Sequence, residues 1–259
     1  MAFQPVVDVD QERVYAYEAL ARGPNGEPAG TVFSAVPLKD RYVFDHCCRS
    51  RAIELACRLD LPEQGVKLAT NFMPGAIYVD GSSVPDTLRV AERFGFPQNL
   101  LVFEINEREE VRNPQHLQSI ADDYRRNGFE FAIDDFGAGF ANLNLLADLA
   151  ASTIKLDMSL IRSLGQRPRA RKIVCAILEL CSTLNIRVIA EGVETVEEFH
   201  ILRDCGVRFM QGYLLARPAF EALPAFTLPK RGTSVPVSAA AERLLRMQTR
   251  VQARNMVAV

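Results

Sequence analysis

The chain has 259 residues, of which 48% are hydrophobic, and its formal net charge is −2. A chain of this size can bury one large core, since barrels of about 250 residues often form a single domain. The near-neutral charge excludes a bulk electrostatic attraction to DNA, RNA or a membrane surface. The sequence contains neither a signal peptide nor an apolar run of about 18 residues, so we expect a cytoplasmic protein without a membrane segment.

The cysteines agree with a reducing compartment. The sequence has 6 cysteines, which are scattered and form no CxxC pair. Most of them lie in helical patterns, which is typical of small buried residues rather than of a disulfide framework. We therefore expect free thiols.

Short β-rich runs alternate with amphipathic helical patterns along most of the chain. The predicted strands cover residues 3–8, 14–21, 67–72, 100–105, 130–135, 152–157, 187–191 and 208–214. The predicted helices lie near residues 40–59, 86–95, 115–127, 141–149, 168–185 and 195–204. Thr195 and Glu198 have the spacing of a capping box, which marks the start of the last of these helices.

The order of these elements predicts the fold. Strands that alternate with helices form βαβ units with a largely parallel sheet, and eight strands in this length favour a closed barrel over an open sheet. The first two predicted strands are joined only by the polar turn at residues 10–13, which is too short for a helical crossover. We therefore predict an α/β protein with a modified TIM-type (β/α)8 barrel that contains one antiparallel strand.

The barrel domain is predicted to cover residues 1–229. Residues 230–259 have the composition of a linker followed by a basic helical tail, in which Leu244, Leu245 and Met247 alternate with arginines. We expect this tail to pack on its own barrel or to fray. The alternative is a helix that contacts a partner or a membrane.

Polar residues occur at the carboxyl ends of successive predicted strands, which face one common mouth in a parallel barrel. In chain order they are Glu18, Asn71, Glu104, Asp134, Asp135, Lys155, Asp157, Glu191 and Gln211, with Glu194 just beyond the seventh strand. Crowded carboxylates raise one another's pKa and resist joint ionisation, so one lysine does not neutralise this set. The available ligand atoms are oxygens, which favours Mg²⁺ or Mn²⁺ over zinc.

The adjacent Asp134 and Asp135 are predicted to form the centre of a binuclear metal site. Each can hold a different divalent cation, or one can bridge two cations, in the kind of site that catalyses phosphoryl displacement. Gly137 and Gly139 then allow the following loop to turn tightly beside the site.

A series of short motifs follows between residues 3 and 225. The first are Phe3-Gln4-Pro5 and the tripeptide Glu18-Ala19-Leu20 followed by Arg22. The later ones are Thr70-Asn71-Phe72, Phe103-Glu104-Ile105-Asn106-Glu107, Asp134-Asp135-Phe136-Gly137-Ala138-Gly139, Ile154-Lys155-Leu156-Asp157, Ala190-Glu191-Gly192-Val193-Glu194-Thr195 and Gln211-Gly212-Tyr213. In their identity and order these motifs resemble the EAL domain, the cyclic-di-GMP phosphodiesterase family.

The resemblance implies a barrel with one reversed strand and the hydrolysis of one phosphodiester bond of cyclic di-GMP, which gives the linear dinucleotide pGpG. It also implies two divalent cations, Mg²⁺ or Mn²⁺. One cation would be held by Glu18, Asn71, Glu104 and Asp134. The other would be held by Asp134 and Asp135, with Glu191 as a ligand or as the base for water.

The resemblance implies roles for the remaining site residues as well. Lys155 would hold the attacking water or offset developing charge, and among carboxylates it should stay protonated. Gln211 would orient water. The substrate would contact Gln4, Leu20 and Arg22, the last of these at a phosphate. Support for the loop after Asp135 would come from Glu194, Gly137, Gly139 and Asp157. A homodimer that uses loop 135–143 is expected, and a regulatory partner is compatible with the family.

Three departures from the family pattern bear on activity. Asn106 stands where threonine is usual, Ala138 replaces a common threonine, and residues 214–216 replace a more aromatic stretch. None removes a metal ligand or Lys155, so the sequence favours an active enzyme. One alternative is a catalytically weak or inactive cyclic-di-GMP receptor that signals to a protein partner. A more distant alternative is a barrel enzyme that stabilises an enolate on Mg²⁺.

Overall fold

The computed structural model describes residues 1–73, 83–107, 118, 121–122, 124–139, 143–149 and 151–230. Within these residues eight strands close into a barrel in the order β2-β3-β4-β5-β6-β7-β8-β1, because β1 also pairs with β2. They are β1 (Ala2–Asp8), β2 (Arg13–Leu20), β3 (Lys67–Asn71), β4 (Leu101–Asn106), β5 (Glu130–Phe136), β6 (Thr153–Leu156), β7 (Arg187–Ala190) and β8 (Phe209–Met210).

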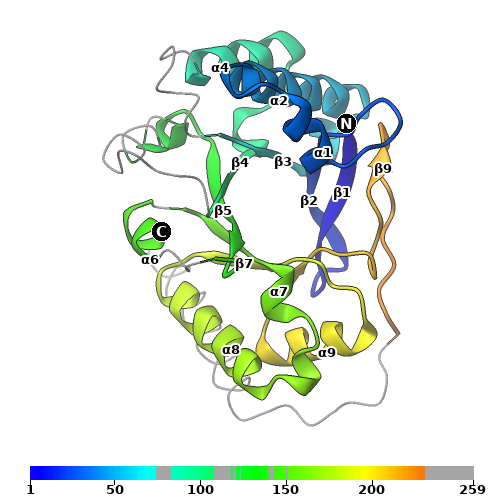
Figure 1. Cartoon of the computed structure of the whole chain (residues 1–259), viewed down its shortest axis with the longest axis vertical. Helices are drawn as coiled ribbons and strands as arrows, with labels where there is room; N and C mark the ends of the chain where they lie inside the picture. Colours follow the sequence, from blue (N-terminus) through cyan, green and yellow to red (C-terminus); the bar gives the residue numbers. More distant parts are fainter. Residues whose placement is uncertain are drawn as a thin grey trace.

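Helices cover the outside of the barrel (Figure 1). They are α1 (Ala29–Ala35), α2 (Arg41–Arg58), α4 (Ser83–Phe94), α6 (Leu143–Asp148), α7 (Met158–Ile161), α8 (Pro168–Thr183) and α9 (Val196–Cys205). The pair α2 and α4 lies at one end of the view in Figure 1, and the pair α8 and α9 lies at the other. None of the helices in the described part of the chain is both long and apolar enough to cross a membrane.

The predicted barrel and its antiparallel strand are confirmed. β1 runs antiparallel to β2, with Gln4 opposite Glu18, whereas the neighbouring strands from β2 to β8 are parallel. The capping box at the start of α9 is confirmed too, since Thr195 Oγ1 accepts the N–H of Glu198 and the Glu198 carboxylate accepts the N–H of Thr195. All 6 cysteines are free thiols.

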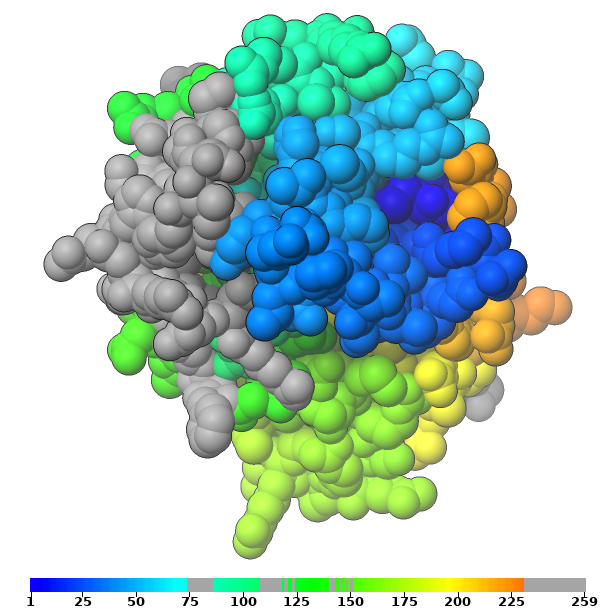
Figure 2. Space-filling view, turned by 45° about the horizontal axis from the view of Figure 1, so that its top comes forward, coloured from blue at the N-terminus to red at the C-terminus, as the bar shows by residue number. Residues whose placement is uncertain are grey.

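Several elements differ from the prediction. The strand predicted at 208–214 is wrong beyond Met210, because the chain then turns and Leu214 donates its N–H to the carbonyl of Val193. The short helices α1 and α7 and the strand β9 (Ala219–Phe220) were not predicted. β9 pairs with β1 outside the ring, and Figure 2 shows its orange segment beside the dark-blue start of the chain. The helix predicted at 115–127 lies partly, and the tail at 231–259 entirely, outside the described residues.

An aromatic cluster packs under α2 and against strands β3 to β5. It consists of Phe72, Phe103, Tyr124, Phe129 and Phe131, all of them buried. The ring centroids of Phe103 and Tyr124 lie 4.8 Å apart, and those of Phe72 and Phe103 lie 5.8 Å apart, with the rings edge to face. This geometry is the one that aromatic pairs prefer, and it fixes the strands whose ends form the site.

A buried carboxylate holds the turn between β1 and β2. Asp8 Oδ1 accepts the N–H groups of Asp10 and Gln11, and the Arg208 guanidinium binds both carboxylate oxygens over 2.9 and 2.6 Å. Burial alone would raise the pKa of Asp8, but the hydrogen bonds from Arg208 and from the turn outweigh it, so the pKa lies below its usual value. Asp8 therefore ties the antiparallel hairpin to β8.

Asp8→Asn is expected to lower the free energy of unfolding by about 1–2 kcal/mol at neutral pH, because hydrogen bonds to a charged group are lost. A depressed carboxyl pKa contributes stability above the unfolded pKa of about 3.9 and loses it as pH falls through the folded value. The difference between the wild type and the variant should therefore shrink below about pH 4 in urea titrations. A constant difference down to pH 2 would contradict this account.

Candidate active site

Alternate residues of each strand point into the barrel, and these inward residues become polar towards the carboxyl ends. The inward pairs, in chain order, are Ala16 and Glu18, Ala69 and Asn71, Val102 and Glu104, Ala132 and Asp134, Thr153 and Lys155, and Ile189 and Glu191. The first member of each pair is buried and mostly apolar. The pleat of the strands thus places a ring of polar side chains at the mouth of the barrel, above a closed apolar layer.

Lys155 lies at the centre of this acidic ring and is fully buried. Its Nζ lies 2.7 Å from Glu191 Oε1, 2.8 Å from Glu104 Oε1, 3.1 Å from Asp134 Oδ1 and 3.4 Å from Glu18 Oε2. The structure therefore brings these residues together from separate strands, as the sequence predicts.

The charges in the ring do not balance. Burial alone would lower the pKa of Lys155, but the surrounding carboxylates, Asp134 first, hold it well above its usual value. Burial raises the pKa of Glu104 and the pKa of Glu191 well above the usual carboxyl range, although Lys155 opposes both shifts. One ammonium does not compensate so many buried carboxylates, and further positive charge would stabilise them.

The carboxylates form two groups that could each hold a metal ion. One group is Glu18, Glu104 and Asp134, the other is Asp134, Asp135 and Glu191, and the ligand atoms within each group lie within 4.8 Å of one another. Glu104 Oε2 is buried and has no hydrogen-bond partner among the described residues, as suits an oxygen that coordinates a cation. Asn71 lies opposite Glu104 in the sheet and adds a neutral oxygen. These residues fit two hard divalent cations that share Asp134.

Asp135 reaches the same site as Asp134 because the strand is irregular there. Consecutive residues of a regular strand point to opposite faces. The φ angle of Asp135 is +54°, and the pairing of β5 with β6 shifts register between Ile133 and Phe136. Aspartate tolerates the left-handed region better than most residues do. The local twist therefore turns two adjacent carboxylates towards one site.

Asn106 and Glu107 hold the start of the glycine loop. Asn106 Nδ2 donates to Asp135 Oδ2, and Glu107 Oε2 accepts the N–H of Gly137 over 3.0 Å. Gly137 has a φ of +91°, which requires glycine at this turn. Burial and the neighbouring Asp134 raise the pKa of Asp135, whereas the hydrogen bond from Asn106 opposes the shift. The loop and the candidate metal site are thus joined through two side chains at the end of β4.

Glu194, which is expected to support this loop, contacts Arg162 and Glu198. Its carboxylate pairs with Arg162 over 2.9 Å, and its N–H donates to Glu198. Within the described residues, the carboxylate bound to the glycine loop is that of Glu107, which we did not select from the sequence. Glu107 is the last residue of the motif at 103–107, and this position could have identified it as a site residue. Asp157 caps α7 by accepting the N–H of Ser159.

Gln211 and Gln4 connect the ring to strand β1. Gln211 Nε2 donates to Glu18 Oε2 over 2.6 Å and to Gln4 Oε1 over 3.3 Å. Gln4 Nε2 in turn donates to the carbonyl of Ala216. Gln211 Oε1 is buried and has no hydrogen-bond partner in the described part of the chain, so it could accept one from a water molecule. Both ends of the Gln4 amide are engaged within the protein.

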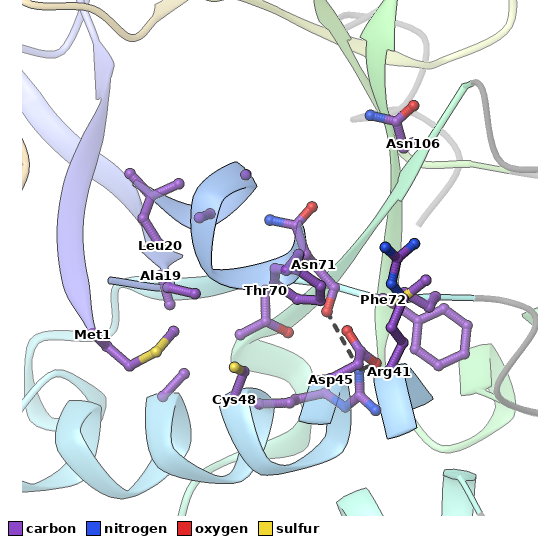
Figure 3. A pocket seen from close by; sticks show the side chains of 17 residues that line it. Met1, Ala19, Leu20, Arg41, Asp45, Cys48, Thr70, Asn71, Phe72 and Asn106 are labelled. Carbon is purple, nitrogen blue, oxygen red and sulfur yellow. Dashed lines mark hydrogen bonds and ion pairs between the residues drawn. The ribbon is translucent and has the colours of Figure 1, made fainter. Parts of the chain in front are cut away.

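Two pockets flank the acidic ring. The first has a volume of about 350 Å³ and extends from Leu20, Asn71 and Asn106 to Phe33 and Arg41 on α1 and α2 (Figure 3). The second has a volume of about 300 Å³, and its lining includes Gln4, Asp135, Glu191, Gln211 and Tyr213. Both volumes fall within the range of small-molecule sites, about 300–1,000 Å³. The site therefore has the form of a polar centre between two pockets.

The comparison with known families decides the classification. A model of the EAL domain matches residues 1–218. The chain belongs to the EAL domain family. In this EAL domain, Glu18 of the signature tripeptide faces the acidic ring and Leu20 lines the first pocket. Arg22 makes a local contact, in which its Nη1 donates to the carbonyl of Ala21.

Curated relatives of this EAL domain include enzymes and a regulator. It is 32% identical over 225 residues to a cyclic di-GMP phosphodiesterase of Pseudomonas aeruginosa, which covers 84% of this chain and 38% of that protein. It is 26% identical over 230 residues to BluF, a blue light- and temperature-regulated antirepressor of Escherichia coli, which covers 89% of this chain and 57% of BluF. The chain thus spans less than two thirds of either relative.

Solved structures share the fold. A standalone EAL protein from Vibrio cholerae, in its c-di-GMP-bound form, has a TM-score of 0.82 and 44% identity, and the match covers 88% of this chain and 94% of that one. Klebsiella pneumoniae BlrP1, in a complex with manganese and cyclic di-GMP, has a TM-score of 0.79 and 34% identity, and the match covers 85% of this chain and 56% of that one.

Proposed function

We propose that this EAL domain hydrolyses one phosphodiester bond of cyclic di-GMP and releases linear pGpG. The observation that carries the proposal is the convergence of the acidic ring on Lys155, with carboxylates in two groups that could each hold a cation. The name of the Pseudomonas relative and the ligands of the Vibrio and Klebsiella structures support the same substrate. The two flanking pockets suit a ligand that carries two bases on either side of a phosphodiester ring.

The metal ligands would divide between two cations, Mg²⁺ or Mn²⁺. Glu18, Asn71, Glu104 and Asp134 would hold one, and Asp134 and Asp135 would hold the other, with Glu191 as a further ligand or as the base for water. When bound, the cations would supply positive charge for the phosphate oxygens and for the activation of water.

The other side chains would act on the phosphate and on water. Lys155 remains cationic at neutral pH because its pKa is raised, so it stabilises negative charge rather than accepting a proton. Gln211 would orient water through Oε1, and Gln4 would keep the Gln211 amide in place. Leu20 would contact a base in the first pocket. Arg22 would release the carbonyl of Ala21 to bind a phosphate.

Turnover with defined metals tests the proposal. The purified protein is incubated with cyclic di-GMP and Mn²⁺ or Mg²⁺, and the products are separated by chromatography. We expect pGpG that is lost with EDTA, because EDTA removes the cations, and in Glu18→Ala, because the variant lacks a ligand of the first cation. Binding of intact cyclic di-GMP without any product, with either metal, would overturn the phosphodiesterase proposal.

The same experiment separates the second candidate, a receptor that binds cyclic di-GMP and signals to a protein partner. The similarity to BluF, which is named an antirepressor, favours this candidate. A receptor would bind the dinucleotide tightly and leave it intact. The complete set of carboxylates and Lys155 favours the enzyme, since a receptor has no need of a second cation group.

Three further properties are proposed from the family. They are a cytoplasmic location, a homodimer that uses loop 135–143, and control by a regulatory partner. Residues 140–142 of that loop lie outside the described residues. The molar mass in solution, measured by light scattering after size-exclusion chromatography, would test the dimer.

A further inference from the structure

Arg49 is a buried cation on α2 that the proposed mechanism does not use. Its side chain is 2% exposed, as is that of Asp45 one turn earlier, and Arg49 Nη1 lies 2.8 Å from Asp45 Oδ2. The guanidinium lies 5.1 Å from the ring centroid of Phe72 and 6.0 Å from that of Phe103. The guanidinium of Arg49 thus projects from α2 onto the aromatic cluster, next to the end of β3.

The guanidinium also reaches the end of β3. Arg49 Nη1 donates to the backbone carbonyl of Asn71 over 3.3 Å. On the other side of the same peptide group, the N–H of Phe72 donates to the carbonyl of Glu104 over 2.8 Å. The peptide that follows Asn71 is therefore held at both ends, by α2 and by β4. Figure 3 shows Asn71 above Asp45, with a dashed line from Asn71 towards α2.

Stability alone does not explain the buried ion pair. Replacing such a pair with apolar residues is often neutral or stabilising, because two charges must lose their hydration. Arg49 Nη1 donates to a carboxylate and a carbonyl while the planar guanidinium lies over aromatic rings, and an ammonium does not reproduce this stacking. Because Nη1 makes both contacts, the guanidinium ties the carbonyl of Asn71 to the carboxylate of Asp45 on α2.

We propose that Arg49 is a positioning residue that sets the orientation of Asn71 beside Glu104 and thereby the affinity for the first cation. The inference rests on the proposed function, which makes Asn71 and Glu104 ligands of that cation. Asn71 has an exposed side chain at the strand end, so its direction depends on the peptide that Arg49 and Glu104 hold. Arg49 borders the first pocket, but its polar contacts go to Asp45 and to the carbonyl of Asn71.

Direct Mn²⁺ binding tests the inference without turnover. The signal of free Mn²⁺ in electron paramagnetic resonance is followed during titration of the full chain. Arg49→Lys should weaken one site by about 10–100-fold, the usual cost of losing a contact that orients a metal ligand. Arg51→Lys is the matched control on the same helix, since Arg51 pairs with Glu54 and Glu221 at the surface, and it should bind Mn²⁺ as the wild type does.

A double-mutant cycle asks whether Arg49 acts through Asn71. Asn71→Ala should weaken the same site, and Arg49→Lys should then add little in that background, because the two changes remove one interaction. If the two substitutions weakened Mn²⁺ affinity independently, so that their fold-changes multiplied in the double variant, the inference would be overturned. Wild-type Mn²⁺ affinity in Arg49→Lys or in Asn71→Ala would overturn it as well.

A second variant tests whether weaker Mn²⁺ binding in Arg49→Lys comes only from a loss of folding. The double change Asp45→Leu with Arg49→Met removes both buried charges and should remain folded, with the same weakened Mn²⁺ site. Wild-type Mn²⁺ affinity in this variant would overturn the role of Arg49 and leave the proposed hydrolysis intact. Absence of Mn²⁺ binding in the wild type would instead reject the proposed function, and the inference with it.

Discussion

Lys155→Met is expected to lower kcat by about 10²–10³-fold at saturating Mn²⁺, as the loss of one fixed charge-stabilising donor usually does. Lys155 Nζ lies 2.7 Å from Glu191 Oε1 at the centre of the ring, where the reacting phosphate would gain negative charge. Methionine fills similar space without the ammonium. Because the ammonium would act on charge that develops during the reaction, kcat should fall more than KM rises. Steady-state rates with cyclic di-GMP measure both.

The same substitution should destabilise the metal-free protein by about 3–5 kcal/mol at pH 8, because the buried carboxylates lose their cation. The pKa values of Glu104 and Glu191 are already raised, and loss of the ammonium raises them further. The folded state then binds more protons than the unfolded state above about pH 4.3, so stability falls as pH rises towards the raised values.

Urea unfolding at pH 6 and pH 8, with EDTA or with Mn²⁺, checks this account. The EDTA form of Lys155→Met should be more stable at pH 6 than at pH 8, and Mn²⁺ should remove most of the difference. Lys172→Met on α8 is the control, since Lys172 is exposed. Turnover within tenfold of the wild type would contradict the role given to Lys155.

The site was predictable because polar residues recur at one end of successive strands. Period-two alternation and parallel pairing are enough to bring Glu104, Asp134 and Lys155 to one mouth. The contribution of Asp135 was predicted, but its cause was not. A left-handed residue and a register shift turn it back towards Asp134, and neither can be read from the letters Asp-Asp.

Contacts that depend on tertiary packing were not predictable in the same way. Arg49 lies in a helical pattern where an arginine is normally solvated, and only the packing of α2 on β3 buries it beside Asn71. Glu107 lies one residue beyond β4, so its partner depends on the path of the loop after β5. The helix α7 has four residues, too few to produce a periodic pattern.

The end of β8 also depends on tertiary packing and was not predicted. A substitution just beyond it is expected to have the second large effect. The β-rich run at 208–214 predicts a strand, yet strand pairing ends at Met210 because the chain then passes close to Val193. Val193 donates its N–H to the carbonyl of Gln211 and accepts the N–H of Leu214. A Cβ on Gly212 would lie 2.6 Å from the carbonyl carbon of Val193 and closer still to its nitrogen and oxygen.

Gly212→Ala is therefore expected to cost about 3 kcal/mol in the free energy of unfolding, the upper end for inserting a methyl group into a packed region. The obstacle is backbone, which cannot rotate away as a side chain can, so the segments carrying Glu191 and Gln211 must separate. A displacement of about 1 Å at these groups would lower kcat about 100-fold. Urea unfolding and steady-state rates measure the two effects. Gly30→Ala is the matched control for stability, because a Cβ there meets no atom within 4 Å, and it should not lower the free energy of unfolding. If Gly212→Ala retained wild-type stability and turnover, the close crossing at Val193 would not be a constraint on the site.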